Sequence, residues 1–177
     1  AFYIDSNSDV VWATSTDNGG TWPTTGQTVA AGIYLGVAAW YDSWTPGDTT
    51  GNFIHLAFFE SVGDTIEYSR FATTYNTATT AVDASGAKEG TLSETNDIAI
   101  TKGTDGDLYV GTVDASAPNA GANFVEKCTG SCTSASNWVA AGTTNPWDGS
   151  SSDFLGEPAL VLLPLSGGTI MLVSNDV

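Results

Sequence analysis

The chain has 177 residues, 41% of them hydrophobic, and a formal net charge of −16 from 4 Lys+Arg against 20 Asp+Glu. The acidic balance excludes nucleic acid as a partner, because phosphate contacts need a basic surface, and it argues equally against an anionic membrane. No apolar run approaches the length of a membrane span, so no membrane insertion is expected. The composition predicts one domain with a substantial core. Its acidic surface fits a secreted or virion protein, a high-salt habitat, cation binding, or solubility through net repulsion.

Short apolar runs separated by Gly, Thr, Ser, Asn and Asp predict an all-β chain without an amphipathic helix. In chain order we expect strands over residues 1–5, 9–14, 35–40, 53–59, 65–70, 97–100, 108–113, 123–127, 137–140, 157–163 and 169–173. His55 stands alone in one of these apolar runs, which predicts a core or edge residue.

The segment after the second predicted strand reads Ser15-Thr16-Asp17-Asn18-Gly19-Gly20-Thr21-Trp22. The Asp17 carboxylate can accept backbone N–H groups across a tight turn, and the glycines permit a positive φ. The octapeptide resembles the Asp-box, or BNR repeat, of sialidase-like β-propellers. Every defining position is filled, by Ser15, Asp17, Gly19, Thr21 and Trp22. In that family the box is a structural turn away from the active face, so the resemblance implies a fold and assigns no chemistry to these residues.

Corresponding residues recur along the chain at nearly constant spacing. Ala38, Ala99 and Ala159 follow one another at 61 and 60 residues in the predicted first strands. The turn positions Ser15, Phe71 and Cys128 are 56 and 57 residues apart. The octapeptide is therefore intact in the first unit and degenerate in the second, and the cysteine pair replaces it in the third.

A repeat of about 55–60 residues with four short strands is typical of one β-propeller blade. We therefore predict a β-propeller of four-stranded antiparallel blades, with blade pieces at approximately 1–31, 32–90, 91–145 and 146–177. This amounts to about three blades where propellers have about 4–8, so we expect an excerpt of a longer polypeptide or a chain completed by partner chains. A β-sandwich is the alternative.

The two cysteines lie in Cys128-Thr129-Gly130-Ser131-Cys132. A Cys-x3-Cys pair without a nearby His does not provide the ligands of a zinc site, and it lacks the Cys-x-x-Cys spacing of redox enzymes. The pair predicts a disulfide that clamps a turn, with two free thiols as the alternative. A disulfide would place the protein in an oxidising, extracytoplasmic compartment.

In propellers of this class, ligands meet the axial face, and the repeat places seven carboxylates there. Two stand at the start of inner strands, Asp97 and Glu157, and five lie in connections between second and third strands: Glu60, Asp64, Asp114, Asp5 and Asp9. They could act as general acid and base or bind a hard cation such as calcium; otherwise they are solvated loop residues. We expect no other cofactor and assign no metal ligand.

Sialidases hold the substrate carboxylate with three arginines, and this chain has one, Arg70, in a predicted third strand. Gly156 occupies the position of the inner-strand arginine that precedes Pro158 in the family pattern. Sialidase activity is therefore not expected. The enzymatic alternative is a glycoside hydrolase that uses the paired carboxylates on neutral glycans.

Trp40, Trp44 and Trp147 lie in or beside loops rich in polar residues. An exposed aromatic ring beside Asp or Asn suits the apolar face and hydroxyl edge of a sugar, whereas packing between blades is the other interpretation. We therefore expect a binding or structural module that is secreted or exposed on a cell or virion surface. Its expected partners are glycans, or other chains in a fibre or appendage.

Overall fold

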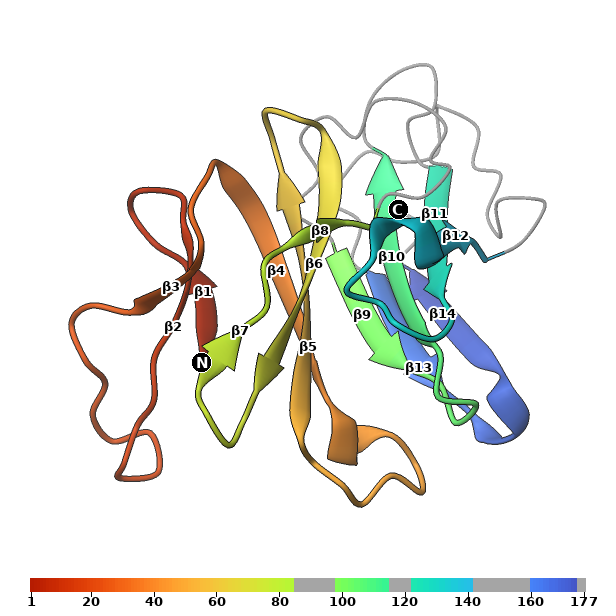
Figure 1. Cartoon of the computed structure of the whole chain (residues 1–177), viewed down its shortest axis with the longest axis horizontal. Helices are drawn as coiled ribbons and strands as arrows, with labels where there is room; N and C mark the ends of the chain where they lie inside the picture. Colours follow the sequence, from red (N-terminus) through yellow and green to blue (C-terminus); the bar gives the residue numbers. More distant parts are fainter. Residues whose placement is uncertain (85–97, 115–121, 142–159, 175–177) are drawn as a thin grey trace.

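A computed structural model of the chain describes residues 1–84, 98–114, 122–141 and 160–174 (Figure 1). These residues form fourteen β-strands and three one-turn 3-10 helices, and they contain no α-helix. The predicted all-β class is confirmed. Within the same ranges, no helix is long and apolar enough to cross a membrane.

The strands form four sheets that follow one another along the chain. The first sheet has the antiparallel order β1-β2-β3 and the second has the order β4-β5-β6-β7, with β8 also paired to β6. Their bounds are β1 Phe2–Ile4, β2 Val10–Trp12, β3 Gln27–Ala30, β4 Tyr34–Tyr41, β5 Phe53–Glu60, β6 Thr65–Ala72, β7 Thr77–Ala78 and β8 Val82–Asp83. A 3-10 helix, η1 Asp42–Trp44, follows β4.

The third sheet has the order β9-β10-β11-β12, and the fourth is the hairpin β13-β14. Their bounds are β9 Ile98–Lys102, β10 Leu108–Asp114, β11 Ala122–Cys128, β12 Trp138–Ala140, β13 Leu160–Pro164 and β14 Ile170–Ser174. The helices η2 Ala135–Asn137 and η3 Ser166–Gly168 lie in connections of these sheets. All pairings in the four sheets are antiparallel between strands close in sequence, which short turns can provide.

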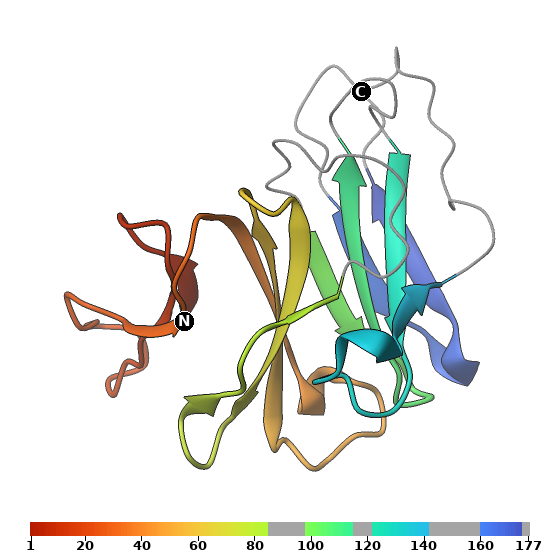
Figure 2. The same ribbon diagram turned by 45° about the horizontal axis from the view of Figure 1, so that its top comes forward.

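The sheets lie side by side in chain order, and both views show this arrangement (Figures 1 and 2). The first strands β4, β9 and β13 contact one another in succession. The apolar run of β5 does not alternate strictly with polar residues, and the packing of its two faces explains why it still forms a strand. Leu56 and Phe58 pack toward the first sheet, whereas Ala57 and Phe59 pack toward the third. Both faces of β5 are therefore covered, and both need apolar side chains.

The turns 15–22, 42–52, 73–76, 103–107 and 165–169 lie at one end of the sheets, the lower end in Figure 1. The connection 129–137 leaves the third sheet on the same side as the 103–107 turn, because Leu108 pairs with both Lys102 and Cys128. Contacts between sheets tie these turns together. Trp12 packs edge-on against Phe71, with their ring centroids 5.1 Å apart. Thr45 Oγ1 donates to the carbonyl of Lys102 at 3.2 Å, and Thr104 Oγ1 donates to that of Leu165 at 3.3 Å. We call this region the Asp17 end.

Candidate functional site

A cavity of about 260 Å³ opens at the Asp17 end, between the second and third sheets. One wall comes from the loop after η1 and from strands β5 and β6. The other wall comes from Lys102, the β9–β10 turn and the loop after Cys128. The cavity is thus built from segments far apart in the sequence, which the packing of two sheets brings together.

A hydrogen-bonded chain of three buried side chains lies in the cavity wall: Asp42, His55 and Tyr68. His55 Nε2 lies 2.9 Å from Asp42 Oδ1, and its Nδ1 lies 2.8 Å from the Tyr68 hydroxyl. A carboxylate only accepts hydrogen bonds, so Nε2 of a neutral His55 carries the proton and Nδ1 accepts from Tyr68. The prediction that His55 is a core residue is confirmed, and the structure adds two polar partners.

The environment keeps this chain of side chains neutral at His55 and Tyr68. Burial lowers the pKa of His55 more than its hydrogen bond to Asp42 raises that pKa. Burial also raises the pKa of the Tyr68 phenol, so the hydroxyl stays protonated at neutral pH. His55 accepts the phenol hydrogen bond, but burial lowers the pKa of His55 and raises that of Tyr68, and both shifts oppose proton transfer from the phenol to the imidazole. The arrangement therefore orients these side chains.

Lys102 connects the third sheet to this chain of side chains. Its Nζ lies 2.8 Å from Asp42 Oδ1 and 2.7 Å from Asp48 Oδ2. Burial raises the pKa of Asp42, but the hydrogen bonds from Lys102 and His55 outweigh burial and leave that pKa below its usual value. Both ends of the bridge are therefore charged at neutral pH.

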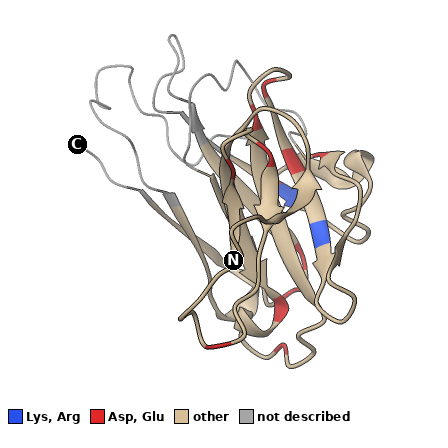
Figure 3. Ribbon diagram, turned by 90° about the vertical axis from the view of Figure 1, so that its left-hand side faces the viewer, with Lys and Arg blue, Asp and Glu red and all other residues tan. Residues whose placement is uncertain are grey.

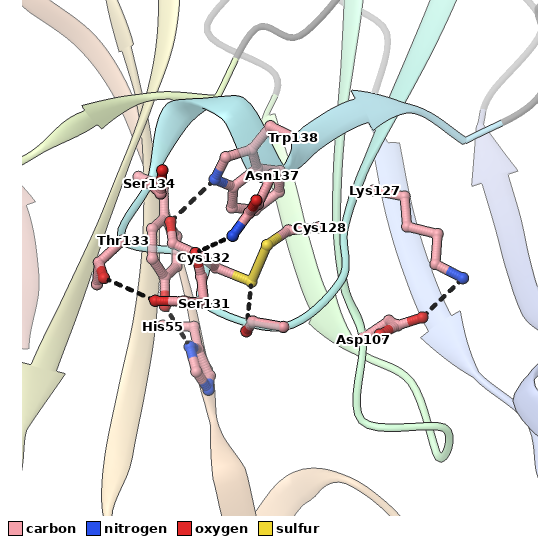
Figure 4. The surroundings of a disulfide bond; sticks show 12 residues. His55, Asp107, Lys127, Cys128, Ser131, Cys132, Thr133, Ser134, Asn137 and Trp138 are labelled. Carbon is pink, nitrogen blue, oxygen red and sulfur yellow. Dashed lines mark hydrogen bonds and ion pairs between the residues drawn. A yellow bond between two sulfur atoms is a disulfide. The ribbon is translucent and has the colours of Figure 1, made fainter.

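Lys127 and Arg70 differ in their surroundings. Lys127 Nζ lies 2.7 Å from Asp107 Oδ2 and 3.9 Å from Asp105 Oδ2 (Figure 4). The Arg70 guanidinium lies in the cavity wall, 4.3 Å from the centroid of the Phe53 ring. It has no carboxylate partner among the described residues. Figure 3 shows how few basic segments stand among the acidic ones on the ribbon.

The disulfide predicted from the sequence is present and confirmed. Cys128 and Cys132 are bonded, with Cα atoms 5.7 Å apart, and both side chains are buried. The loop folds back on itself, since Trp138 Nε1 donates to the carbonyl of Cys132 at 3.0 Å and Asn137 Nδ2 to that of Ser131 at 2.9 Å (Figure 4). Cys132 also contributes to the cavity wall, so the disulfide positions part of the site.

Two of the three predicted sugar-binding tryptophans lie at the Asp17 end. The Trp44 side chain is exposed at 60% relative accessibility. Its ring is edge-on to Trp40 and Tyr41, with centroid separations of 5.8 and 6.1 Å. Trp40 is half-buried, and its Nε1 donates to Thr45 Oγ1 at 2.9 Å. Trp147 lies outside the described residues.

The candidate carboxylates are placed only in part. Glu60 ends β5, and its carboxylate accepts N–H groups of Val62, at 3.1 Å, and of Gly63 in the following turn. Asp114 ends β10, whereas Asp97 and Glu157 lie outside the described residues. Within the described part of the chain, no group of three or more His, Cys, Asp or Glu could hold a metal ion.

The Asp-box-like octapeptide forms a self-contained, exposed turn. Asp17 Oδ1 accepts the Thr21 backbone N–H at 2.8 Å, and Oδ2 accepts the Thr21 hydroxyl at 2.7 Å. Ser15 Oγ donates to Asp17 at 2.6 Å and accepts the Gly19 N–H at 2.8 Å, while Trp22 Nε1 donates to the carbonyl of Gly19 at 3.2 Å. The hydrogen bonds from Ser15 and Thr21 lower the pKa of Asp17 to about 2.

Asp42 and Lys102 were not selected by the sequence analysis. A lone His in a run of apolar residues was the available signal, because a buried imidazole needs partners for both nitrogens. The signal could not identify those partners. Asp42 begins a loop, and Lys102 lies in another repeat, 60 residues further on.

Comparison with known proteins describes the fold alone. No protein-family model matches the chain, and neither does any curated protein. The chain resembles the crystal structure of a protein of unknown function from Dyadobacter fermentans, with a TM-score of 0.53 and 14% sequence identity. The match covers 98% of this chain and 51% of that one, so the chain spans about half the length of that protein. The fold and site define an all-β protein of consecutive antiparallel sheets with a polar cavity between two of them.

Proposed function

We propose that the chain is part of an Asp-box β-propeller that acts as a binding module, secreted or exposed on a cell or virion surface. The succession of antiparallel sheets in chain order supports the propeller, since a β-sandwich has two packed sheets and the described residues form four. The successive contacts of β4, β9 and β13 fit the inner strands of adjacent blades. The Asp17 hydrogen bonds fit the turn that the octapeptide resembles.

The outer face of the β13–β14 hairpin supports a further blade beside it. Val161 pairs with Val173 and Leu163 with Met171, so the four apolar side chains share one face, and each is exposed. On the other face, Leu162 is buried against the third sheet. A contiguous exposed apolar face is a feature of surfaces that pack against a partner. A longer chain or a partner chain would supply that blade.

We propose that the module recognises glycans through Trp44, and the observation that carries this proposal is its exposed but fixed indole. Trp40 and Tyr41 hold the ring edge-on from two sides, with interplanar angles of 88° and 90°. A fixed aromatic ring gives up little side-chain entropy when a sugar stacks on it. The same segment exposes Ser43 and Thr49, whose hydroxyl groups can meet those of a sugar.

The test is binding to a glycan array, followed by calorimetry with the best neutral glycan. Trp44→Ala should weaken binding at least about tenfold, because the stacking surface is lost. Tyr75→Ala is the matched control. Tyr75 is also exposed at the Asp17 end, at 78%, and it makes no ring contact with the described residues.

Unchanged binding by Trp44→Ala would contradict the proposal, as would an array without any bound glycan. Release of reducing sugar by the wild-type protein, lost in Glu157→Gln or Asp97→Asn, would instead identify a glycoside hydrolase that uses those carboxylates.

A further inference from the structure

Arg70 is the only arginine of the chain, and among the described residues it is the one Lys or Arg side chain without an acidic partner. Lys102 and Lys127 each pair with two aspartates. In a protein with 20 Asp+Glu and 4 Lys+Arg, an arginine without a carboxylate needs a reason. Its position in the wall of a cavity gives one.

The nearest acidic group in the same cavity wall is already fully used. Asp42 Oδ1 accepts from His55 and Lys102, and its Oδ2 accepts the Phe53 backbone N–H at 3.1 Å. Both oxygens of this carboxylate are therefore occupied by other donors, and none of the described contacts joins it to the Arg70 guanidinium.

The position of Arg70 prepares it to bind a planar anion. The side chain extends from β6, and its guanidinium carbon lies over the Phe53 ring. A guanidinium above a ring uses its face for this contact, so the N–H groups in its plane stay available. Two parallel N–H groups match the two oxygens of a carboxylate, which makes arginine selective for that group.

The remaining polar groups of the cavity suit a hydroxylated ligand. Thr50, Asn52 and Thr133 contribute hydroxyl and amide groups to its wall. They come from two different loops, the one before β5 and the one after β11, and Arg70 lines the same cavity. A volume of about 260 Å³ is small among ligand pockets, which restricts the ligand to a molecule of about one sugar ring.

We propose that this cavity binds a small hydroxylated carboxylate, with Arg70 holding the carboxylate and the two loops meeting the hydroxyl groups. The site lies at the Asp17 end, whereas the arginine position of sialidases belongs to the start of an inner strand. It is also separate from the Trp44 surface, because it needs neither the exposed indole nor a neutral glycan.

Calorimetric titration with two matched probes tests the proposal. Glucuronate and glucose share a ring and differ in having a carboxylate or a hydroxymethyl group. The wild-type protein should bind glucuronate at least about tenfold more tightly than glucose, the difference expected for one charge-assisted pair. Arg70→Gln should weaken glucuronate binding by at least about tenfold. Arg70→Lys should give an intermediate loss, because lysine keeps the positive charge but lacks the two parallel N–H groups of the guanidinium.

Lys127→Gln is the matched control, since it removes the same charge from a residue outside the cavity and should leave glucuronate binding unchanged. Trp44→Ala should leave it unchanged too, which separates this site from the proposed glycan surface. A thermal unfolding curve checks that each variant is folded. If Arg70→Gln does not fold, Arg70→Lys still carries the test.

Equal binding of glucose and glucuronate would overturn the proposal, as would unchanged glucuronate binding by a folded Arg70→Gln or Arg70→Lys protein. Inorganic phosphate bound as tightly as glucuronate would overturn the assignment to carboxylates, because the cavity would then accept anions without regard to shape.

Discussion

The β2–β3 turn and the β11–β12 loop form matching connections, in the first and third sheets and at the same end of the molecule, but they are held differently. In the first, the exposed Asp17 carboxylate gathers hydrogen bonds from Ser15 and Thr21. In the second, the Cys128–Cys132 disulfide and the indole of Trp138 fix the chain, and all three side chains are buried.

The β2–β3 turn is stabilised by local hydrogen bonds, whereas the β11–β12 loop is part of the hydrophobic core. Trp138 packs on Tyr68 across the interface between sheets, with ring centroids 5.2 Å apart, so the β11–β12 loop is linked to the cavity wall. The β2–β3 turn satisfies its polar groups within itself. We expect damage to the first kind of connection to stay local and damage to the second to spread.

The carboxylates of Asp17 and Glu126 show the same contrast between an exposed, hydrogen-bonded group and a buried one. Asp17 is exposed, and hydrogen bonds lower its pKa to about 2. Glu126, in β11 just before the disulfide, is buried, and its Oε2 has no hydrogen-bond partner among the residues that the structure describes. Burial raises the pKa of Glu126 to about 7, and the charge of Asp83 adds to this rise.

The largest expected effect is the loss of the disulfide. Cys128→Ala combined with Cys132→Ala should lower the free energy of unfolding by about 2–4 kcal/mol, through the freed unfolded chain and through lost packing. Denaturant unfolding followed by tryptophan fluorescence measures this, since the buried Trp138 reports on the loop.

Wild-type protein unfolded in a reducing buffer is the matched control, because it loses the bond and keeps both sulfur atoms. A double variant as stable as the oxidised wild type would show that the loop is held by its hydrogen bonds alone, and the contrast with the β2–β3 turn would disappear.

The second-largest expected effect is a pH-dependent loss of stability that results from the burial of Glu126. Its folded pKa, about 7, lies above the unfolded value of 4.5. Between these values the folded state binds more protons, so stability falls as pH rises through the window and levels off above it. Glu126→Gln stays uncharged, and it should be more stable than the wild type by about 1–3 kcal/mol near pH 8, with little difference near pH 4.

Denaturant unfolding at several pH values measures this difference, and Glu60→Gln is the control because it removes a carboxylate from an exposed turn. His55 adds an opposite slope, since its lowered pKa costs stability as pH falls below its unfolded value of 6.5. Both proteins contain His55, so the comparison cancels its contribution. An equal stability of Glu126→Gln and wild type near pH 8 would contradict the prediction.

Local patterns were sufficient to predict much of the fold. Short apolar runs bounded by turn residues located the strands, as in the run that became β5. The spacing of Cys128 and Cys132 indicated a disulfide by excluding zinc and redox motifs. Each of these inferences depends on residues close together in the chain.

The cavity depends on contacts between repeats, which spacing does not encode. From the sequence, Arg70 was notable only because it lies in a predicted third strand, where the sialidase pattern has no substrate-binding arginine. Its value as a binding group follows from the lack of a carboxylate bonded to it among the described residues, since Asp42 in the same cavity wall is bonded to His55 and to Lys102 from the next sheet. A pattern in one strand cannot predict which of 20 acidic residues approaches a given cation.

The smallest expected effect is at Asp17. Its folded pKa lies below the usual 3.8, so the carboxylate contributes its stabilisation above that value and loses it as pH falls through about 2. Asp17→Asn keeps one acceptor oxygen and loses the charge and the second acceptor. Amide hydrogen exchange should therefore become faster at Thr21, while the global unfolding transition stays nearly where it is in the wild type.

Ser15→Ala is the partner variant, because it removes one donor to the same carboxylate and should affect the turn less. A shift of the global transition by Asp17→Asn as large as that caused by the loss of the disulfide would contradict this prediction. The exposed turn would then belong to the cooperative core, and its solvent-exposed hydrogen bonds would stabilise the protein as much as the buried disulfide does.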